Sequence, residues 1–198
     1  MQEPSSSASG GAPRNPREEI LDAAAALLGE SGESGLTIRR LALRSGYTSP
    51  AIYQEFGDKA GLLDAILERA FQALAVRLEG LSPPANPREA MRNYFKTIVR
   101  FGREHPTHYR LMEALQPDEI SPFPSVEALQ QQIEQPVWDV ASGDQAELLR
   151  QSLWVLLHGL ISLPASRPDV AWLEDLDDVA LEAMLTGLLG SEESAGRS

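Results

Sequence analysis

Apolar residues recur along the chain at the spacing of an α-helix rather than of a β-strand. In the first periodic stretch, the apolar positions are Ile20, Ala23, Ala24, Leu27 and Leu28. Intervals of three and four residues place these side chains on one face of a helix. Similar stretches follow to the end of the sequence, and none alternates with the period of two that a strand requires. The pattern therefore predicts an all-α protein of about nine helices.

Capping residues set the boundaries of the first two predicted helices. Asn15 suits the N-cap of the first helix, and Pro16 suits its first position, because the missing N–H would be unpaired there anyway. Glycines at residues 32–35 are expected to end this helix. Thr37 is expected to cap a second helix, which Gly46 ends by taking the left-handed conformation that glycine adopts easily.

Residues 37–56 have the residue types of a helix-turn-helix motif. Ala42 lets two helices approach closely, Gly46 supplies the turn, and Ile52 supplies a branched core side chain. Ser49 is expected to be the N-cap of the motif's second helix. Because the second helix of such a motif enters the major groove of DNA, DNA is the first partner that the pattern indicates.

The remainder of the chain is also predicted to be helical. A longer helix is expected from residue 57 to about residue 81, and a proline-rich break follows at residues 82–87. A second proline-rich loop is expected at residues 116–124. The helices predicted beyond the break are residues 87–104, one that begins at residue 106, and residues 125–141, 145–163 and 177–189.

Charge is unevenly distributed along the chain. The formal net charge of −12 argues against a protein that coats nucleic acid without preference. Residues 34–54 nevertheless contain no acidic side chain, while Arg39, Arg40 and Arg44 supply three positive charges. Such a segment can dock against DNA phosphates, and chance clustering is the alternative explanation.

Composition and motifs exclude several classes of function. The absence of cysteine rules out disulfides, thiolate zinc sites and a cysteine nucleophile. There is no apolar run of membrane-spanning length and no secretory signal, so we expect a cytoplasmic protein. His105 and His108 have no third ligand nearby, and no nucleophile–base pair or glycine-rich phosphate loop is present. We therefore expect no enzyme activity, no cofactor and no metal.

The stretch of residues 16–71 resembles the TetR family of bacterial transcriptional regulators. The resemblance covers the first helix, ILDAAAALL, and then Thr37 to Ala42, Gly46 and Tyr47, Ile52 to Phe56, Lys59, Leu62 and Leu63. Tyr53, Phe56 and Lys59 at this spacing are the most specific part. The resemblance implies a homodimer, a three-helix DNA-binding head and an all-helical C-terminal domain for ligand binding and dimerisation.

The same resemblance assigns the DNA contacts. It implies that phosphates are held by Thr37, Thr48, Tyr53 and Lys59. The complete set of predicted DNA-binding residues is Thr37, Arg39, Arg40, Arg44, Thr48, Ser49, Ala51, Tyr53, Gln54 and Lys59. Phosphate contacts position a protein on DNA, whereas base contacts specify the sequence.

Few long side chains on the predicted recognition helix can read bases. Gln54 suits a bidentate contact with adenine, and Ala51 suits the methyl group of thymine. Tyr53 has an alternative role as a half-buried aromatic packed on the first helix. Glu55 departs from the family pattern, since a carboxylate would repel a phosphate. It could turn away, pair with a nearby arginine or accept a hydrogen bond from a cytosine amino group.

A second motif lies in the C-terminal half. Trp154, His158 and Gly159 form W-x-x-x-H-G, which resembles the TetR C-terminal domain type named for this motif, and residues 105–112 fit the same type. The predicted ligand-binding residues are Tyr94, Ile98, Phe101, Tyr109, Met112, Trp138, Trp154 and His158. The alternative is a structural pair, in which a backbone group satisfies His158 and Trp154 fills the core.

The last two long helices have broad apolar faces, and two copies of each could form a four-helix dimer interface. The predicted interface residues are Leu153, Leu157, Leu160, Leu181, Leu185 and Leu188. The alternative is that a single chain hides these side chains in its own core.

The sequence thus predicts a regulator built from two domains. We expect a disordered tail over residues 1–13, a DNA-binding domain over 14–74, a ligand-binding and dimerisation domain over 75–190 and a frayed tail over 191–198. The expected function is that of a repressor that binds a palindromic operator as a homodimer and is released by a small, mostly apolar effector. The alternative is a ligand-binding and dimerisation module of the same fold with weak or lost DNA binding.

Overall fold

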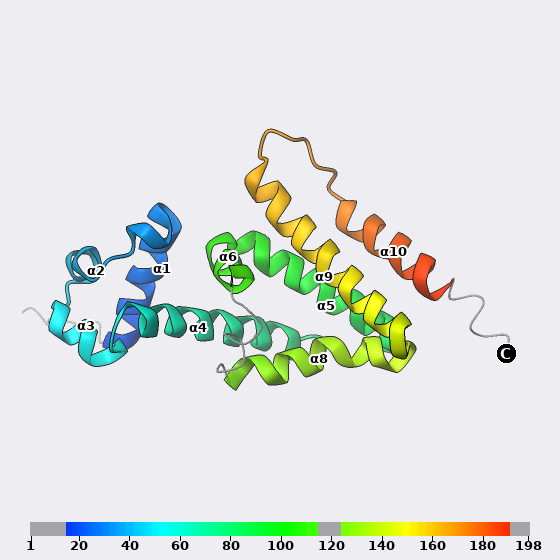
Figure 1. Cartoon of the computed structure of the whole chain (residues 1–198), viewed down its shortest axis with the longest axis horizontal. Coiled ribbons are helices and arrows are strands. Elements are labelled where there is room, and N and C mark those ends of the chain that lie inside the picture. Colours follow the sequence, from blue (N-terminus) through cyan, green and yellow to red (C-terminus); the bar gives the residue numbers. More distant parts are fainter. Residues whose placement is uncertain (1–14, 115–123, 191–198) are drawn as a thin grey trace, which may run out of the picture. The chain divides into compact units, whose positions relative to one another are not determined.

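The computed structural model describes residues 15–114 and 124–190 of the 198-residue chain. The two predicted tails and most of the predicted loop at residues 116–124 lie outside these ranges. The described residues form helices and connecting turns without a strand, so the predicted all-α fold is confirmed (Figure 1). The helices are α1 (Pro16–Gly35), α2 (Ile38–Ser45), α3 (Ser49–Phe56), α4 (Lys59–Glu79), α5 (Pro87–Glu104), α6 (Pro106–Ala114), α8 (Pro124–Val140), α9 (Gly143–Ser166) and α10 (Leu176–Leu189).

The chain divides into two compact units. The first is Met1–Ile66 and the second is Leu67–Ser198, so the division falls within α4. In the parts of the chain that the structure describes, no helix is long and apolar enough to cross a membrane.

Local hydrogen bonds explain where the helices of the first unit begin and end. Asn15 Oδ1 accepts a hydrogen bond from Arg17 N at 3.1 Å, and Thr37 Oγ1 accepts one from Arg40 N at 3.3 Å. These are the predicted N-caps, which pair N–H groups that the first turn of a helix leaves free. Gly46 ends α2 with φ 78° and ψ 2°, a left-handed conformation that costs other residues more.

The predicted cap of α3 is wrong by one residue. Thr48, not Ser49, is the N-cap: its Oγ1 accepts from Ala51 N at 3.4 Å, and its carbonyl accepts from Ile52 N at 3.1 Å. Because the first helical hydrogen bond already starts at the Thr48 carbonyl, Ser49 lies inside the first turn. Pro50 follows in that turn, where a missing N–H is tolerated.

Buried side chains from all four helices close the core of the first unit. The fully or nearly fully buried positions are Ile20, Leu21, Ala24, Leu27, Leu28, Leu36, Leu41, Ile52, Phe56, Leu62 and Ile66. Only two residues of α3, Ile52 and Phe56, belong to this set. The rest of that short helix is left at the surface.

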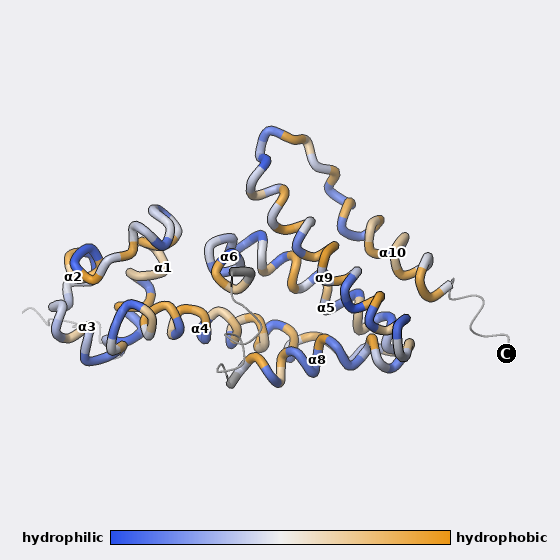
Figure 2. Tube along the Cα trace, viewed as in Figure 1, coloured by the Kyte–Doolittle hydropathy of each residue, from blue (hydrophilic) through white to orange (hydrophobic). Residues whose placement is uncertain are grey.

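Two apolar clusters hold the second unit together. One joins α5, α9 and α10 through Val99, Leu149, Leu181 and Leu185, among others. The other joins α4, α5 and α8 around residues that include Phe101. Figure 2 shows apolar and polar segments alternating along these helices, as amphipathic helices require.

A close approach between helices and a set of charge-assisted bonds complete the second unit. Gly102 of α5 lies against Ile161 of α9, where an added Cβ would be 2.7 Å from the isoleucine side chain. Arg92 binds Glu182 with two hydrogen bonds, of 2.5 and 3.0 Å. Arg88 donates to the carbonyls of Leu185 and Gly190 at 2.9 and 2.6 Å. Together they attach α10 to α5.

Candidate functional site

The exposed face of α3 carries the predicted DNA-contacting side chains. Thr48, Tyr53 and Gln54 are exposed, and Ser49 and Ala51 are partly exposed. Tyr53 is 50% exposed, which agrees both with a contact to DNA and with the alternative of a half-buried aromatic. The buried positions of α3 fix its orientation within the first unit and leave this face open to a partner.

The turn between α2 and α3 is tied to the first helix. Tyr47 donates a hydrogen bond to the Glu19 carboxylate with an O–O distance of 2.5 Å. This bond, together with burial and the negative charge of Glu19, raises the pKa of Tyr47 above its usual value. The Arg17 guanidinium lies 4.7 Å from the centre of the Phe56 ring, a distance typical of a cation–π contact. The helix-turn-helix is thereby attached to α1 at its turn and at the last residue of α3.

Three of the predicted DNA-binding cations contact the end of α1. Arg44 donates to Glu30 Oε2 at 2.8 Å. Lys59 donates to Glu33 at both the backbone carbonyl, at 3.0 Å, and Oε1, at 3.3 Å. Arg40 donates to the Gly35 carbonyl at 2.7 Å and to a serine hydroxyl at 3.0 Å. These three cations are therefore already engaged within the chain, a feature that sequence reasoning missed.

Arg39 and Glu55 differ from these paired groups. Both are exposed, and within residues 15–114 and 124–190 neither side chain has a hydrogen bond or ion pair. The backbone carbonyl of Glu55 accepts from Arg17 at 3.2 Å, but its carboxylate does not take part. The arginine pairing considered for Glu55 is therefore not found among the described residues.

The structure brings together three of the predicted ligand-binding residues. The Tyr109 hydroxyl and His158 Nδ1 are hydrogen-bonded at 2.8 Å, and the rings of Trp154 and His158 meet edge to face with their centres 4.3 Å apart. Trp154 is 59% exposed. The structural-pair alternative is therefore wrong for Trp154, which does not fill the core of this chain, while His158 has a tyrosine side chain as one partner.

The other predicted ligand-binding residues are placed elsewhere. Ile98 and Phe101 are buried in the cluster of α4, α5 and α8, and Tyr94 and Met112 pack against it. Trp138 is 46% exposed. The eight predicted residues are therefore divided between the two core clusters and the surface.

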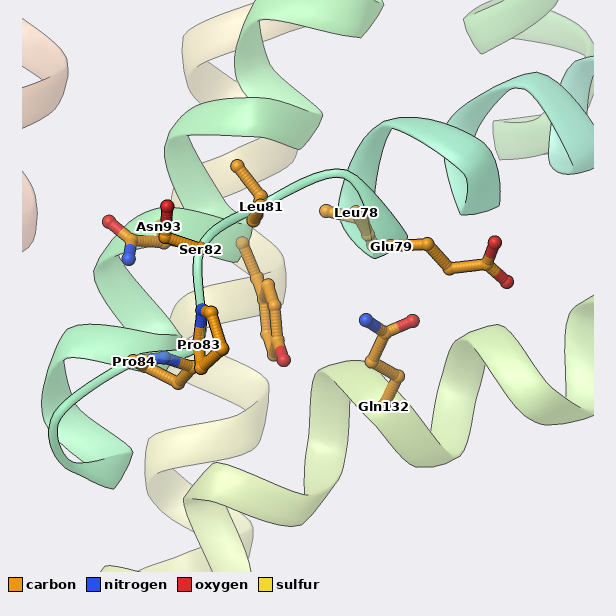
Figure 3. Close-up of a pocket in the computed structure, with 9 residues that line it drawn as sticks. Leu78, Glu79, Leu81, Ser82, Pro83, Pro84, Asn93 and Gln132 are labelled. Atoms are coloured by element: carbon orange, nitrogen blue, oxygen red, sulfur yellow. The ribbon is translucent and has the colours of Figure 1, made fainter.

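A small cavity in the second unit includes one of them. It has a volume of about 120 Å³ and lies where the end of α4 and the following proline turn meet α5 and α8 (Figure 3). Tyr94 lines it, together with Asn93 and Gln132. Since one water molecule takes up about 30 Å³ of liquid, this space suits only a small guest.

The predicted dimer residues divide into two groups. Leu160, Leu181 and Leu185 are buried within the chain's own core, and the other three pack partly buried against it. The prediction that the three buried residues form an interface is corrected, because they present almost no surface to a partner. The exposed apolar side chains of these two helices are instead Leu148, Trp154, Val155, Leu163 and Val179.

The two neighbouring histidines form a ring contact. His105 and His108 have ring centres 5.8 Å apart, and the pKa of His108 is lowered by burial and by the nearby His105 and Arg69. In the described part of the chain, no group of three or more potential metal-binding side chains is found.

Comparison with known sequences identifies the first unit. Residues 20–66 match the family model described as bacterial regulatory proteins, tetR family. The class C tetracycline repressor protein of Escherichia coli is 48% identical over 52 residues, which are 26% of this chain and 24% of that protein. The transcriptional repressor AcnR of Corynebacterium glutamicum is 43% identical over 59 residues, 30% of this chain and 31% of the relative.

A longer match extends beyond the first unit. The nucleoid occlusion factor SlmA of Vibrio campbellii is 31% identical over 100 residues, which are 50% of this chain and 51% of that protein. The chain thus spans between about a quarter and about a half of the length of these curated relatives.

Solved structures match over nearly the whole chain. A Rhodococcus sp. RHA1 protein of unknown function has a TM-score of 0.71 at 24% identity, covering 89% of this chain and 96% of its own. A TetR family regulator from Marinobacter aquaeolei has a TM-score of 0.66 at 18% identity, covering 85% and 93%. These likenesses show a shared fold. The match of residues 20–66 assigns that segment, which contains the helix-turn-helix described above, to the tetR family of bacterial regulatory proteins.

Proposed function

We propose that this chain is a DNA-binding transcriptional repressor that acts as a homodimer on a palindromic operator. One observation carries the proposal: α3 is held by two buried residues, Ile52 and Phe56, and leaves Thr48, Tyr53 and Gln54 exposed on one side of a helix-turn-helix. A recognition helix needs this arrangement to enter a major groove. The named relatives, which include repressors, support the same function.

The predicted domains are part of this proposal. Residues 14–74 would bind DNA, and residues 75–190 would bind the effector and a second copy of the chain. A two-fold dimer presents two recognition helices about one turn of DNA apart, which is why a palindrome is expected. The motif of Trp154, His158 and Gly159 supports assignment of the second domain to the type named for it.

Because three of the predicted interface leucines are buried, we propose that the dimer forms through the exposed apolar side chains of α9 and α10 instead. Val155 and Leu148 on α9 and Val179 on α10 are more than half exposed. An added Cβ at Gly159 of α9 or Gly187 of α10 would meet nothing within 4 Å, so both helices also offer small positions that another helix can approach. We name Leu148, Trp154, Val155, Leu163 and Val179 the α9/α10 apolar face.

A small, mostly apolar effector is proposed to act on the second unit. Tyr109 and His158 form a partly buried polar pair beside the exposed ring of Trp154, which offers one polar and one flat contact. Ile98 and Phe101 are packed in the core, so an effector that reaches them must move the helices apart. Release from DNA then follows if the effector prefers a head spacing that does not match the operator.

Binding-site selection on random duplex DNA tests the proposal. The full chain should enrich a palindrome whose half-sites are about one helical turn apart. Recovery of a single half-site would contradict the dimeric mode of binding. Recovery of no sequence, with no binding to random DNA at low salt, would contradict DNA binding itself.

The alternative function is a ligand-binding and dimerisation module with weak or lost DNA binding. The engagement of Arg44 and Lys59 by acidic residues, and the exposed Glu55 carboxylate, favour this alternative. A repressor should lose affinity for random DNA steeply as salt rises, because binding releases counterions from the phosphates. A module without DNA binding would bind at no salt concentration.

A further inference from the structure

We propose that the C-terminal end of α1 is an internal competitor for the DNA backbone, which holds the phosphate-binding cations of the head until DNA displaces it. We name residues 30–35 the α1 anionic end. This inference rests on the proposed DNA binding and adds a form of regulation to the same surface.

The geometry of the head supports the competition. The α1 anionic end contributes two carboxylates, one to each of two cations: Glu30 binds Arg44 at 2.8 Å and Glu33 binds Lys59 at 3.3 Å. Its last carbonyl, that of Gly35, receives Arg40 at 2.7 Å. Two cations of α2 and one of α4 thus converge on six consecutive residues. A carboxylate offers an arginine the same charge and acceptor atoms as a phosphate oxygen.

The local backbone explains why this short segment can reach all three cations. Gly32 has φ 64° and ψ −174°, so the helical path of α1 is broken inside the segment. After the break, the Glu33 backbone and side chain both contact Lys59. The carbonyls at the end of a helix also carry partial negative charge, which favours nearby cations.

The sequence shows how unusual this arrangement of charge is. Residues 34–54 contain no acidic side chain, so the helix-turn-helix itself does not neutralise its arginines. The neutralising carboxylates come from just outside that window. Arg44 and Lys59 are therefore 14 and 26 residues away from their carboxylates in the sequence and adjacent to them in the structure.

The pairs are weak enough to be exchanged. The Arg44 and Glu30 side chains are 38% and 54% exposed, and those of Lys59 and Glu33 are 40% and 59% exposed. Exposed pairs of this kind change an equilibrium by a factor of about 2 to 5. The α1 anionic end therefore lowers the affinity for DNA without abolishing it. Because it competes with the phosphates of the DNA backbone, its effect should be the same for every base sequence.

Fluorescence anisotropy with a labelled random duplex measures the effect. Glu30→Gln should bind about 2 to 5 times more tightly than the wild type at low salt. Glu33→Gln should gain less, because Lys59 keeps its bond to the Glu33 carbonyl. Glu127→Gln, which removes the same charge from an exposed position in the second unit, is the matched control and should bind like the wild type. Equal gains for this control would overturn the proposal.

A double-mutant cycle separates competition from simple repulsion. If Glu30 acts by holding Arg44, then Glu30→Gln should not raise the affinity of a chain that already carries Arg44→Gln. If Glu30→Gln gives the same gain with and without Arg44, the carboxylate only repels DNA at a distance and the proposal fails. Thermal unfolding of each variant checks that the head stays folded.

The outcomes also separate this inference from the proposed function. A wild type that binds random DNA, with glutamine variants that bind equally well, contradicts the inference and leaves DNA binding in place. Binding by the wild type that becomes tighter in Glu30→Gln/Glu33→Gln, but not in the control, supports both the inference and the proposed function. Binding by none of the variants contradicts both, because Arg44 and Lys59 then no longer face a carboxylate and still do not hold phosphates.

Discussion

Gln54 and Lys59 are both on the proposed DNA surface, but their side chains suit different contacts, one with a base and the other with a phosphate. Gln54 is exposed on α3 and is the one amide of that helix. An amide can donate and accept at once, so it can read the edge of an adenine. Lys59 is a point charge at the first position of α4, and it suits a phosphate rather than a particular base.

Alanine substitutions at these two positions should therefore have different signatures. Gln54→Ala should lose about 1–3 kcal/mol of discrimination at one base pair and leave the affinity for random DNA nearly unchanged. Lys59→Ala should weaken binding to all sequences and lower the salt slope by about 1. Titrations of selected and random duplexes over a range of salt measure both quantities. Equal losses on both duplexes for Gln54→Ala would show that it does not read sequence.

The role of a single residue could be predicted where its side chain bonds to residues close to it in the sequence. The caps Asn15 and Thr37 follow from short-range hydrogen bonding. Thr48 and Ser49 could not be separated by sequence, because both are good N-cap residues and lie side by side. The pairing of Glu30 with Arg44 was not predicted, since it depends on how α1 and α2 approach each other.

At the scale of helices, the approach of α5 to α9 depends on one residue without a side chain. Gly102 is buried, and an added Cβ would come within 2.7 Å of two carbon atoms of Ile161. Ordinary carbon contacts are about 3.5–4.0 Å. The two helices can therefore lie this close together only while position 102 is glycine or position 161 is smaller.

Gly102→Ala should lower the free energy of unfolding by about 1–3 kcal/mol, because it overpacks a tight helix contact. Ile161→Ala removes the atoms that clash, so in that background Gly102→Ala should be neutral or stabilising. Urea denaturation of the four chains of this cycle gives the coupling. A cost that is the same in both backgrounds would show that the helix contact is not the cause.

The positions of the helices were largely predictable, whereas the inward side of α9 and α10 was not. Caps, prolines and apolar periodicity give the limits of α5 directly, as Pro87–Glu104. Both α9 and α10, in contrast, carry apolar residues on more than one side: Leu181 is fully buried, while Val179 is 58% exposed. A sequence with two apolar sides does not say which of them faces its own core.

In the single chain, several large apolar side chains of α9 and α10 are exposed instead of packed in the core. The α9/α10 apolar face includes Trp154 and Val155, which are 59% and 63% exposed. Exposed apolar side chains that gather on a surface mark interaction sites in proteins, so we expect a partner on these helices. In the proposed dimer, a second copy of the same two helices would cover it.

Val155→Glu should disrupt the proposed dimer, because it buries an unpaired carboxylate at the interface. Self-association should weaken by at least about tenfold, and binding to a palindrome should weaken with it. Val76→Glu is the matched control: Val76 is 66% exposed on α4 and lies outside the α9/α10 apolar face. Sedimentation velocity over a range of concentrations measures the association, and an unchanged dimer in Val155→Glu would refute this interface.

The attachment of α10 to α5 has a consequence for how the chain is made. The hydrogen-bond acceptors of Arg88 and Arg92 follow them by 90 residues or more in the sequence. The helix that, with its C-cap, carries these acceptors also supplies the core residues Leu181 and Leu185. The first unit, in contrast, has all of its core by Ile66. Since domains generally fold from the N-terminus during synthesis, the first unit can be native on the ribosome while the second unit still lacks its last helix.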